Sequence, residues 1–382
     1  VSARRSANGL IGGLHRNRRL EQLAGPIVEA VLNDANLDGK DVEEIVIGNT
    51  TAGGGNPARL IALCSGIPET ASASSVDRQC ASGLESLATA IRLIVTGAAN
   101  IVVAGGAEAP STAPWRVAKP KAPHLQPHFH DPTPFTEAES GIPEIAQAAE
   151  NLSKKFKIER KRQDAFALHS HKKAQDAYSK QSFSGEITPI RIEAGEGRDE
   201  SLRDEISSEL LAQMPAYFSP DGSVTSGNSS PVNDGTAVAL VVSEDIYSAM
   251  GKPPALRILN VCTVGVNPGL FGMGSVPAVQ KILHSSDKIN LSDIGHIEVA
   301  ETSAAQVLAC ADQLSINEEL INPDGGSIAL GHPLGASSAV MITRLFSRMV
   351  RNRPNAVTSL NLGMATMGAA GGLGTAAIFE AV

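Results

Sequence analysis

Two residues far apart in the chain have the types and local settings that covalent catalysis needs. Cys80 stands in Val-Asp-Arg-Gln-Cys-Ala-Ser-Gly-Leu, at a turn between an expected strand (Ser74–Arg78) and an expected helix (Ala81–Gly97). His332 stands between a glycine and a proline in Gly-Gly-Ser-Ile-Ala-Leu-Gly-His-Pro-Leu-Gly-Ala-Ser. A cysteine attacks as its thiolate, and a histidine can take the thiol proton near neutral pH. The two residue types therefore predict a nucleophile and its general base.

The expected position of Cys80 at the start of a helix favours its ionised form. A helix dipole and free backbone N–H groups lower the pKa of a thiol at that place. The N–H group of Cys80 itself could stabilise an oxyanion on a bound acyl group. The alternative interpretations are structural: a free cysteine is most often a small buried hydrophobe, and a histidine in a turn is most often solvated.

The remaining cysteines and histidines are assigned no chemistry. Three cysteines match no functional pattern and are expected to be packing residues: Cys64, Cys262 and Cys310. Four possible metal ligands stand close together among prolines: His124, His128, His130 and Asp131. No further cysteine or carboxylate has ligand spacing there, so we expect a solvated loop and no metal site. His169 and His171 lie on a charged helix and are expected at the surface.

Hydrophobic periodicity predicts an α/β layered core that is built twice. The first part is expected to alternate as helix Leu20–Asn36, strand Glu44–Gly48, strand Ser74–Arg78, helix Ala81–Gly97 and strand Asn100–Ala104. A continuous apolar strand is expected at Thr236–Val242. The alternation then restarts as strand Ala255–Val261, helix Val276–His284, strand Ile294–Val299, helix Ser303–Gln313 and helix Ala336–Val350.

The middle of the chain has a different character. From Pro110 to about Pro143 the sequence is rich in proline, histidine and lysine and has no periodicity, and Ile145–Ser179 is then strongly helical and charged. This region is expected to be an insertion on the core. The two flanking halves share one detail, because Gly83 and Gly335 each follow a candidate catalytic residue by three positions and precede a helix. Two similar halves that each present one catalytic residue are therefore expected.

Composition excludes several function classes. The 382 residues are enough for two or three domains, and 42% hydrophobic with 19% charged residues is typical of a soluble globular enzyme. A net charge of −8 argues against nucleic-acid binding and leaves an anionic cofactor open. The four cysteines form no CxxC pair, which favours a reducing compartment, the cytoplasm, over a disulfide framework. No apolar run is long enough to span a membrane.

The segments around Cys80 and His332, together with a glycine run near the C-terminus, resemble the thiolase family. The resemblance extends over essentially the whole chain and implies an acyltransferase that acts on acyl-CoA or 3-ketoacyl-CoA. It implies a layered α-β-α-β-α fold of two similar α/β halves, each with a five-stranded sheet. The first half is expected at 1–116 and 222–247, an inserted loop domain at 117–221 and the second half at 248–382.

The resemblance also assigns further roles. Thr225-Ser226-Gly227-Asn228-Ser229-Ser230-Pro231 is similar to a thiolase segment whose serine contacts CoA, which places Ser230 at the substrate. Gly371, in the C-terminal glycine run, is likewise implied to bind the CoA substrate. CoA and acyl-CoA are expected as substrates, with no permanently bound cofactor, and a homodimer or homotetramer is implied.

Two positions depart from the family pattern. Thiolases carry a second cysteine in the last loop, which exchanges the proton on the α-carbon, and Gly368 stands at that position. Where thiolases have the asparagine of Asn-Glu-Ala-Phe, which holds a water that helps stabilise the enolate oxygen, this chain has Ala300. Ala370 replaces a glycine of the oxyanion hole but keeps its backbone N–H.

Both losses fall on the carbon–carbon step, and Cys80 and His332 serve acyl transfer. Three readings stay open: a thiolase in which another residue replaces the missing acid, an enzyme that only transacylates, and a protein that only binds acyl-CoA.

Overall fold

The computed structural model describes the whole chain except residues 121, 123, 130–144, 191–196, 287–288 and 353–360. Its first sheet has the strand order β1-β8-β5-β3-β4, with β2 attached to β8. The strands are β1 (Ser2–Arg5), β2 (Gly9–Leu10), β3 (Glu44–Gly48), β4 (Ser72–Val76), β5 (Ile101–Glu108) and β8 (Asn233–Val242). β3, β4 and β5 are parallel, whereas β8 runs antiparallel to β5 and β1 runs antiparallel to β8.

The second sheet repeats this pattern. Its order is β10-β11-β12-β9, formed by β9 (Leu256–Gly265), β10 (Ile294–Val299), β11 (Leu362–Ala369) and β12 (Leu373–Ala381). β11 is parallel to β10 and antiparallel to β12, and β12 is antiparallel to β9. The first sheet has the same succession of orientations along β3, β5, β8 and β1. In place of a fifth strand there is an isolated parallel bridge between Ile297 and Ile321. The expectation of two similar α/β halves is confirmed, although the second sheet has four strands.

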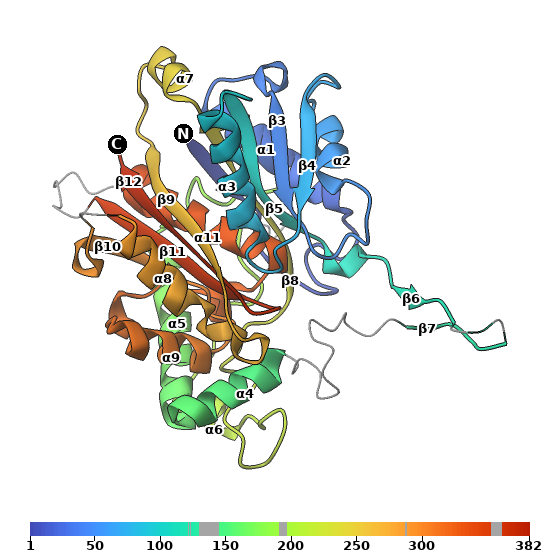
Figure 1. Cartoon of the computed structure of the whole chain (residues 1–382). Coiled ribbons are helices and arrows are strands. Elements are labelled where there is room, and N and C mark those ends of the chain that lie inside the picture. The colour runs from blue at the N-terminus through green and yellow to red at the C-terminus, as the bar shows by residue number, and fades with distance from the viewer. Residues whose placement is uncertain (121, 123, 130–144, 191–196, 287–288, 353–360) are drawn as a thin grey trace.

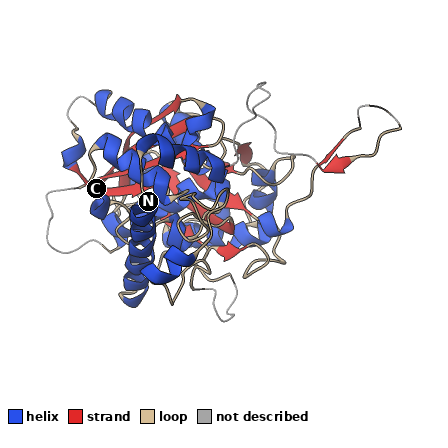
Figure 2. Ribbon diagram, turned by 90° about the horizontal axis from the view of Figure 1, so that it is seen from below, coloured by secondary structure: helices blue, strands red, loops and turns tan. Residues whose placement is uncertain are grey.

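Helices form three layers around and between the sheets (Figures 1 and 2). The outer face of the first sheet is covered by α1 (Leu20–Asp34) and α2 (Pro57–Cys64), and that of the second by α8 (Ser275–His284) and α9 (Ala304–Leu314). Between the sheets lie α3 (Ser82–Val95) and α11 (Ser337–Phe346), which continues as a π-helical turn, Ser347–Arg351. A single apolar cluster joins both central helices to both sheets, so the halves share one core.

The glycines that follow Cys80 and His332 have a packing function. A Cβ on Gly83 would stand 2.8 Å from the Cβ of Ala339 on α11 and 3.1 Å from the carbonyl oxygen of Gly335. A Cβ on Gly335 would stand 2.6 Å from a carboxylate oxygen of Glu108. Gly83 therefore permits α3 to approach α11 closely, and Gly335 permits the histidine loop to approach the Glu108 carboxylate.

The inserted region packs against the second half. It contains β6 (Val117–Ala118), β7 (His128–Phe129), α4 (Ile145–Phe156), α5 (Arg160–Ser179) and α6 (Ser208–Gln213). α4 and α5 both contact α9, and α5 also contacts α10 (Ser327–Leu330). The β6–β7 hairpin projects from the body in Figure 1 and carries exposed aromatic rings, Trp115 and Phe129, that meet edge to face.

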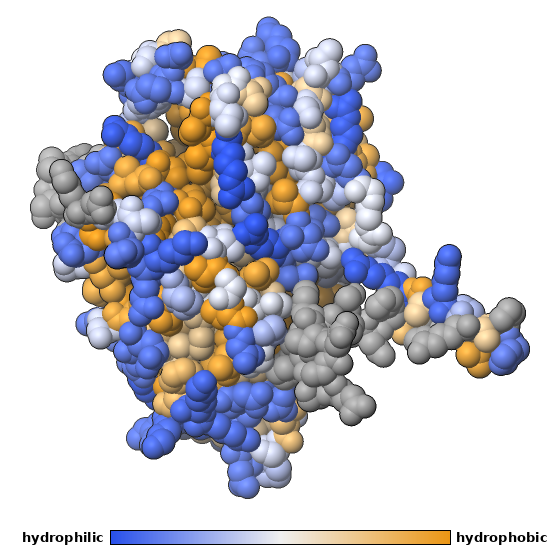
Figure 3. Space-filling model, in the orientation of Figure 1, coloured by the Kyte–Doolittle hydropathy of each residue, from blue (hydrophilic) through white to orange (hydrophobic). Residues whose placement is uncertain are grey.

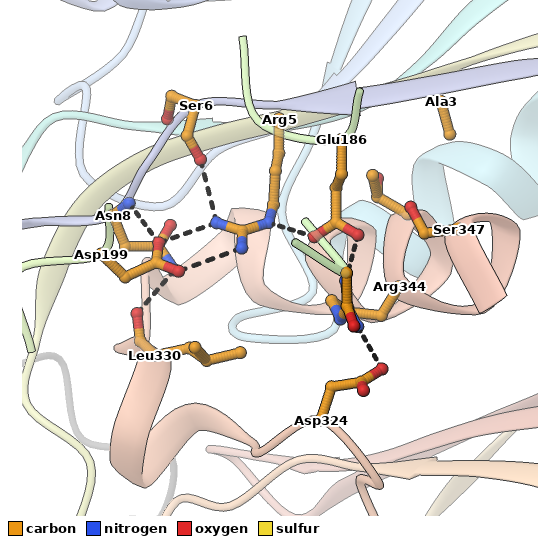
Figure 4. A network of polar contacts seen from close by, with 12 residues as sticks. Ala3, Arg5, Ser6, Asn8, Glu186, Asp199, Asp324, Leu330, Arg344 and Ser347 are labelled. Carbon is orange, nitrogen blue, oxygen red and sulfur yellow. Dashed lines mark hydrogen bonds and ion pairs between the residues drawn. The ribbon is translucent and has the colours of Figure 1, made fainter. Parts of the chain in front are cut away.

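A buried ion network ties the insertion to both halves (Figure 4). The Arg5 guanidinium on β1 donates to Glu186 at 2.6 Å and to Asp199 at 2.7 and 3.0 Å, and both of the latter residues come from the inserted region. Glu186 also accepts from Arg344 on α11, which is paired with Asp324. Arg5, Glu186 and Arg344 are almost fully buried, so these charges depend on one another for compensation.

The helical character expected for Ile145–Ser179 is present as two helices, because Lys157 adopts a left-handed conformation (φ +55°) and ends α4. Two other expectations were wrong. His171 is buried, not at the surface, because the segment around Arg203 covers it. Cys64 is exposed and is not a packing residue, whereas Cys310 is buried and Cys262 half-buried.

Candidate active site

Cys80 occupies a sharp turn between β4 and α3. The preceding residue, Gln79, has φ +53°, a conformation that non-glycine residues rarely adopt. The hydroxyl of Ser82 holds the turn, because it accepts from the Arg78 N–H at 2.8 Å and donates to the Gln79 carbonyl. Ser338 on α11 adds a tie from the second half by donating to the Cys80 carbonyl at 3.1 Å. The turn presents the thiol toward the interface between the two halves.

His332 reaches the thiol from the second half. Its Nε2 lies 3.3 Å from the Cys80 Sγ, and its Nδ1 lies 2.9 Å from the Ser337 hydroxyl. The His332 backbone N–H donates to the Asn233 side chain at 3.0 Å, which fixes the loop against β8. Gly331 permits this approach, since its φ is +95° and a Cβ there would stand 2.6 Å from Asn233. The structure thus brings together the two residues that the sequence singled out.

Burial sets the protonation states of the pair. Burial, with a further contribution from the Glu108 carboxylate, raises the pKa of the Cys80 thiol to about 12. The backbone N–H groups of Cys80 and Ala370 oppose this rise because they stabilise the thiolate. Burial lowers the pKa of His332 to about 4. The expectation of a lowered thiol pKa was therefore wrong, and the resting pair is a neutral thiol and a neutral imidazole.

Glu108 joins the loop after β3 to the histidine loop and lies close enough to Cys80 to affect the pKa of its thiol, and sequence reasoning missed it. It is fully buried at the end of β5, and its carboxylate accepts from the Thr50 N–H at 2.6 Å and from the Gly335 N–H at 3.1 Å. Burial raises the pKa of Glu108 against the effect of these hydrogen bonds. The only sequence signal is a carboxylate at the end of an apolar strand, where an uncompensated charge would be costly.

The Gly368 position has no room for a side chain. Gly368 lies near the end of β11, between Met367 and Ala369, which belong to the apolar cluster that contains Cys80. The N–H of Ala370 acts on the Cys80 thiol. A Cβ on Gly368 would stand 2.6 Å from the carbonyl oxygen of Phe271 and 3.0 Å from that of Gly272. Backbone of the η3 segment (Pro268–Gly274) therefore occupies the space beside Gly368.

We expect Gly368→Cys to destabilise the protein without adding carbon–carbon cleavage. The new Cβ would overlap backbone atoms, and overpacking of this kind costs about 1–3 kcal/mol. Gly368→Ala adds the same Cβ and should lose a similar free energy of unfolding in urea denaturation. A gain of thiolysis in the cysteine variant, with unchanged stability, would show that the η3 segment yields easily.

The other positions implied by the resemblance lie around the pair. Ala300 is buried in the apolar cluster that contains Cys80. Its backbone N–H donates to the Thr366 carbonyl, and its methyl side chain can make no hydrogen bond. Ser230 is half-buried and belongs to the segment that runs beside His332, with Val232 bridged to that residue. Its hydroxyl donates to the Thr302 carbonyl at 3.3 Å. Gly371 forms the left-handed turn between β11 and β12.

The described residues hold neither a metal-binding cluster nor a membrane-spanning helix. Within that part of the chain no group of three or more histidine, cysteine, aspartate or glutamate side chains could hold a metal ion. His130 and Asp131 of the histidine cluster lie outside the described residues. Among the described helices, none is long and apolar enough to cross a membrane.

Comparison with known proteins identifies the family. The family model described as thiolase, N-terminal domain, matches residues 1–245, and that described as thiolase, C-terminal domain, matches residues 252–381. A Staphylococcus epidermidis protein, provisionally named acetyl-CoA C-acetyltransferase VraB, is 35% identical over 100% of this chain and 97% of its own length.

Two solved structures agree. The Bacillus anthracis acetyl-CoA acetyltransferase has a TM-score of 0.91 and 33% identity, covering 100% of this chain and 98% of that one. Human mitochondrial 3-ketoacyl-CoA thiolase also has a TM-score of 0.91, with 30% identity and the same coverage. The chain therefore belongs to the thiolase family of acyltransferases.

Proposed function

We propose that this protein takes the acyl group of an acyl-CoA onto Cys80 and passes it to an acceptor, with His332 as general base. The observation that carries the proposal is the 3.3 Å approach of the Cys80 Sγ to the His332 Nε2, between two loops 252 residues apart in sequence. A thiol beside a fixed imidazole is the arrangement that activates a cysteine nucleophile. The thiolase family assignment supports acyl-CoA as the substrate class.

The proposed step is a thioester exchange. The Cys80 sulfur forms a bond to the acyl carbon as its proton moves to the His332 Nε2. The bond between the acyl carbon and the CoA sulfur then breaks, and the imidazolium returns the proton to the departing thiolate. The N–H groups of Cys80 and Ala370, which act on the thiol in the resting protein, are placed to donate to the oxyanion of the intermediate.

We propose further that the carbon–carbon step is impaired. Cleavage of a 3-ketoacyl-CoA expels an enolate, which needs a proton donor and hydrogen bonds to its oxygen. Gly368 has no side chain to exchange a proton, and backbone of the η3 segment stands where such a side chain would extend. Ala300 offers only a methyl group where an asparagine would hold a water. The thioester exchange requires neither group.

Intact-mass spectrometry after mixing the protein with 3-ketohexanoyl-CoA in CoA-free buffer tests the proposal, with Cys80→Ala as the control. We expect an adduct with the mass of the whole 3-ketohexanoyl group that is absent in the control. A butyryl adduct that needs Cys80 would show that the carbon–carbon bond is cleaved and that another group supplies the proton. Absence of any adduct, also with acetyl-CoA, would contradict acyl transfer and favour a binding protein.

A homodimer is part of the proposal. Strand β4 is an edge of the first sheet, and its sequence Ser-Ala-Ser-Ser-Val has none of the charges or prolines that commonly protect an edge. On the face shown in Figure 3, apolar side chains gather between the halves. A second copy paired along β4 would satisfy the free edge, and a monomeric mass at micromolar concentration in analytical ultracentrifugation would contradict this.

A further inference from the structure

A small cavity lies beside the histidine loop and is lined in part by Gly331 and Ser337. Its volume is about 20 Å³, and its polar lining side chains are Glu298, Ser327, Ser337 and Arg344. A buried water needs about 10–15 Å³ of such space and two to four polar partners. The cavity therefore has the size and the lining for a single water molecule. Ser337 is the residue whose hydroxyl meets the His332 Nδ1.

Two of the lining groups lack a protein partner. Arg344 is 2% exposed, and its Nε has no hydrogen-bond partner although both of its terminal nitrogens are paired. Glu298 is 3% exposed, and within the described part of the chain no hydrogen bond or ion pair reaches its carboxyl group. A buried donor and a buried acceptor without partners are both costly, and one shared water would satisfy both.

The strand geometry directs Glu298 toward this cavity. Its neighbours Ile297 and Val299 on β10 belong to the outer apolar cluster under α8 and α9. Successive side chains alternate between the faces of a strand, so Glu298 faces inward, toward α11. Among the neighbouring charges, the Arg344 guanidinium has the largest effect on the pKa of Glu298, which it lowers, and this agrees with an inward orientation of the side chain.

We propose that one water molecule in this cavity joins Glu298 to Ser337, so that Glu298 is a positioning residue for His332. The inference rests on the proposed role of His332 as the base. In the resting chain of hydrogen bonds, the Cys80 S–H donates to His332 Nε2, and His332 Nδ1–H donates to Ser337. The Ser337 hydroxyl then donates to the water, which also accepts from the Arg344 Nε–H and donates to Glu298.

This chain of hydrogen bonds selects the reactive tautomer. The Glu298 carboxyl group is the acceptor at the far end of this chain. It makes the water, the Ser337 hydroxyl and the His332 Nδ1–H each donate in the direction of Glu298. The Nε2 lone pair is thereby kept free for the thiol proton, as in other catalytic histidines that are oriented by a second acceptor. When the imidazolium forms, an ionised Glu298 would stabilise it through the same chain. Such help is needed because burial alone makes His332 a weak base.

Several charged groups near Glu298 affect the pKa of its carboxyl group. Arg344 and Arg348 face it from α11 and the π-helical turn, Asp324 from the loop before α10, and Glu186 from the inserted region. His296 lies two residues earlier on the same face of β10. Burial raises the pKa of Glu298 to about 8, and Arg344 and Arg348 act against that rise. Ionisation of Glu298, and with it the support for the imidazolium, therefore increases as pH rises through 8.

Alkylation of Cys80 by iodoacetamide tests the inference without acyl-CoA. The rate is followed at the Cys80 peptide by mass spectrometry between pH 6 and pH 10, and exposed Cys64 serves as a reference in the same molecule. We expect Glu298→Gln to slow Cys80 about tenfold to hundredfold, the loss of one hydrogen bond to a charged group, with Cys64 unchanged. The wild-type rate should also rise more steeply through pH 8 than that of the variant.

A double-mutant cycle separates this role from a structural one. Glu298→Gln and Ser337→Ala should not be additive, because each interrupts the same chain. Thr343→Val is the matched control, since it removes a buried hydroxyl of α11 that bonds only the Ala339 carbonyl. Its effect should be small and additive with that of Glu298→Gln. Additivity of the first pair, or a Glu298 variant that alkylates like the wild type, would overturn the proposal.

A crystal structure of the unmodified protein provides a test that does not depend on variants. Ordered density between Glu298, Ser337 and Arg344 Nε is expected, and a cavity without it would overturn the inference. If the wild type forms no acyl adduct with acetyl-CoA but shows the coupling in alkylation, the proposed function fails and the hydrogen-bond chain stands. If adducts form and the coupling is absent, the function stands and the role of Glu298 fails.

Discussion

His332→Ala should lower the rate of Cys80 acylation by acetyl-CoA at least about a thousandfold at neutral pH, the scale of losing a nucleophile's base. The reason is that burial holds the pKa of the Cys80 thiol at about 12, so only a minute fraction is thiolate without a proton acceptor. The N–H groups of Cys80 and Ala370 remain, but they stabilise a thiolate that scarcely forms without the imidazole. Quenched-flow mixing followed by intact-mass spectrometry measures the rate.

Substitution of an exposed histidine is the control for the acylation experiment. His124→Ala removes an imidazole from the surface and should leave the rate unchanged. Stability should be compared as well, because His332 is buried and its loss leaves a cavity beside Ser337. A His332 variant that remains folded and acylates within tenfold of the wild type would show that a different group takes the thiol proton.

Arg5→Met should lower the free energy of unfolding by about 3–5 kcal/mol, the cost of leaving a buried charge without its partner. Arg5 is fully buried and neutralises carboxylates of Glu186 and Asp199, which come from the inserted region. Asp199 also accepts the Asn8 N–H, and the Asn8 side chain donates to the carbonyl of Leu330, two residues before His332. The loss should therefore loosen both the insertion and the histidine loop.

The adjacent arginine supplies a matched control for the stability measurement. Arg4 points to the other face of β1 and pairs with Asp34 at 2.6 Å in a partly exposed position. Because solvent screens such pairs, Arg4→Met should cost no more than about 1 kcal/mol. Urea denaturation of both variants gives the two values. Equal losses would mean that burial of the Arg5 network does not matter for stability.

Local patterns in the sequence were sufficient for most of the fold. The strand expected at Ile294–Val299 has those bounds in the structure, and the helix expected after Cys80 begins at Ser82. These elements are long, apolar and periodic, so their own residues decide their conformation. The break in the charged helix was missed because Lys157 gives no local signal. That break is fixed by Ser153 and Gln163, whose side chains donate to the Ile158 carbonyl.

The candidate pair could be proposed from the sequence, but its electrostatics could not. The sign of the Cys80 pKa shift depends on burial under the second half and on Glu108, 28 positions later in the chain. The position of Ser337 against the His332 ring depends on how η6 (Leu334–Ala336) turns into α11. The absence of space at Gly368 depends on backbone from Phe271 and Gly272. Each of these facts is a contact between segments that no local pattern relates.

The division of the reactive pair between the two halves has a consequence for synthesis of the protein. The strand order shows that the first sheet is completed by β8, which ends at Val242, whereas His332 is translated 90 residues later. A nascent chain on the ribosome thus carries its thiol without a base to activate it. In the proposed mechanism, transfer of an acyl group from acyl-CoA to Cys80 begins only when the last third of the polypeptide has emerged and docked, because His332 is then in place beside the thiol.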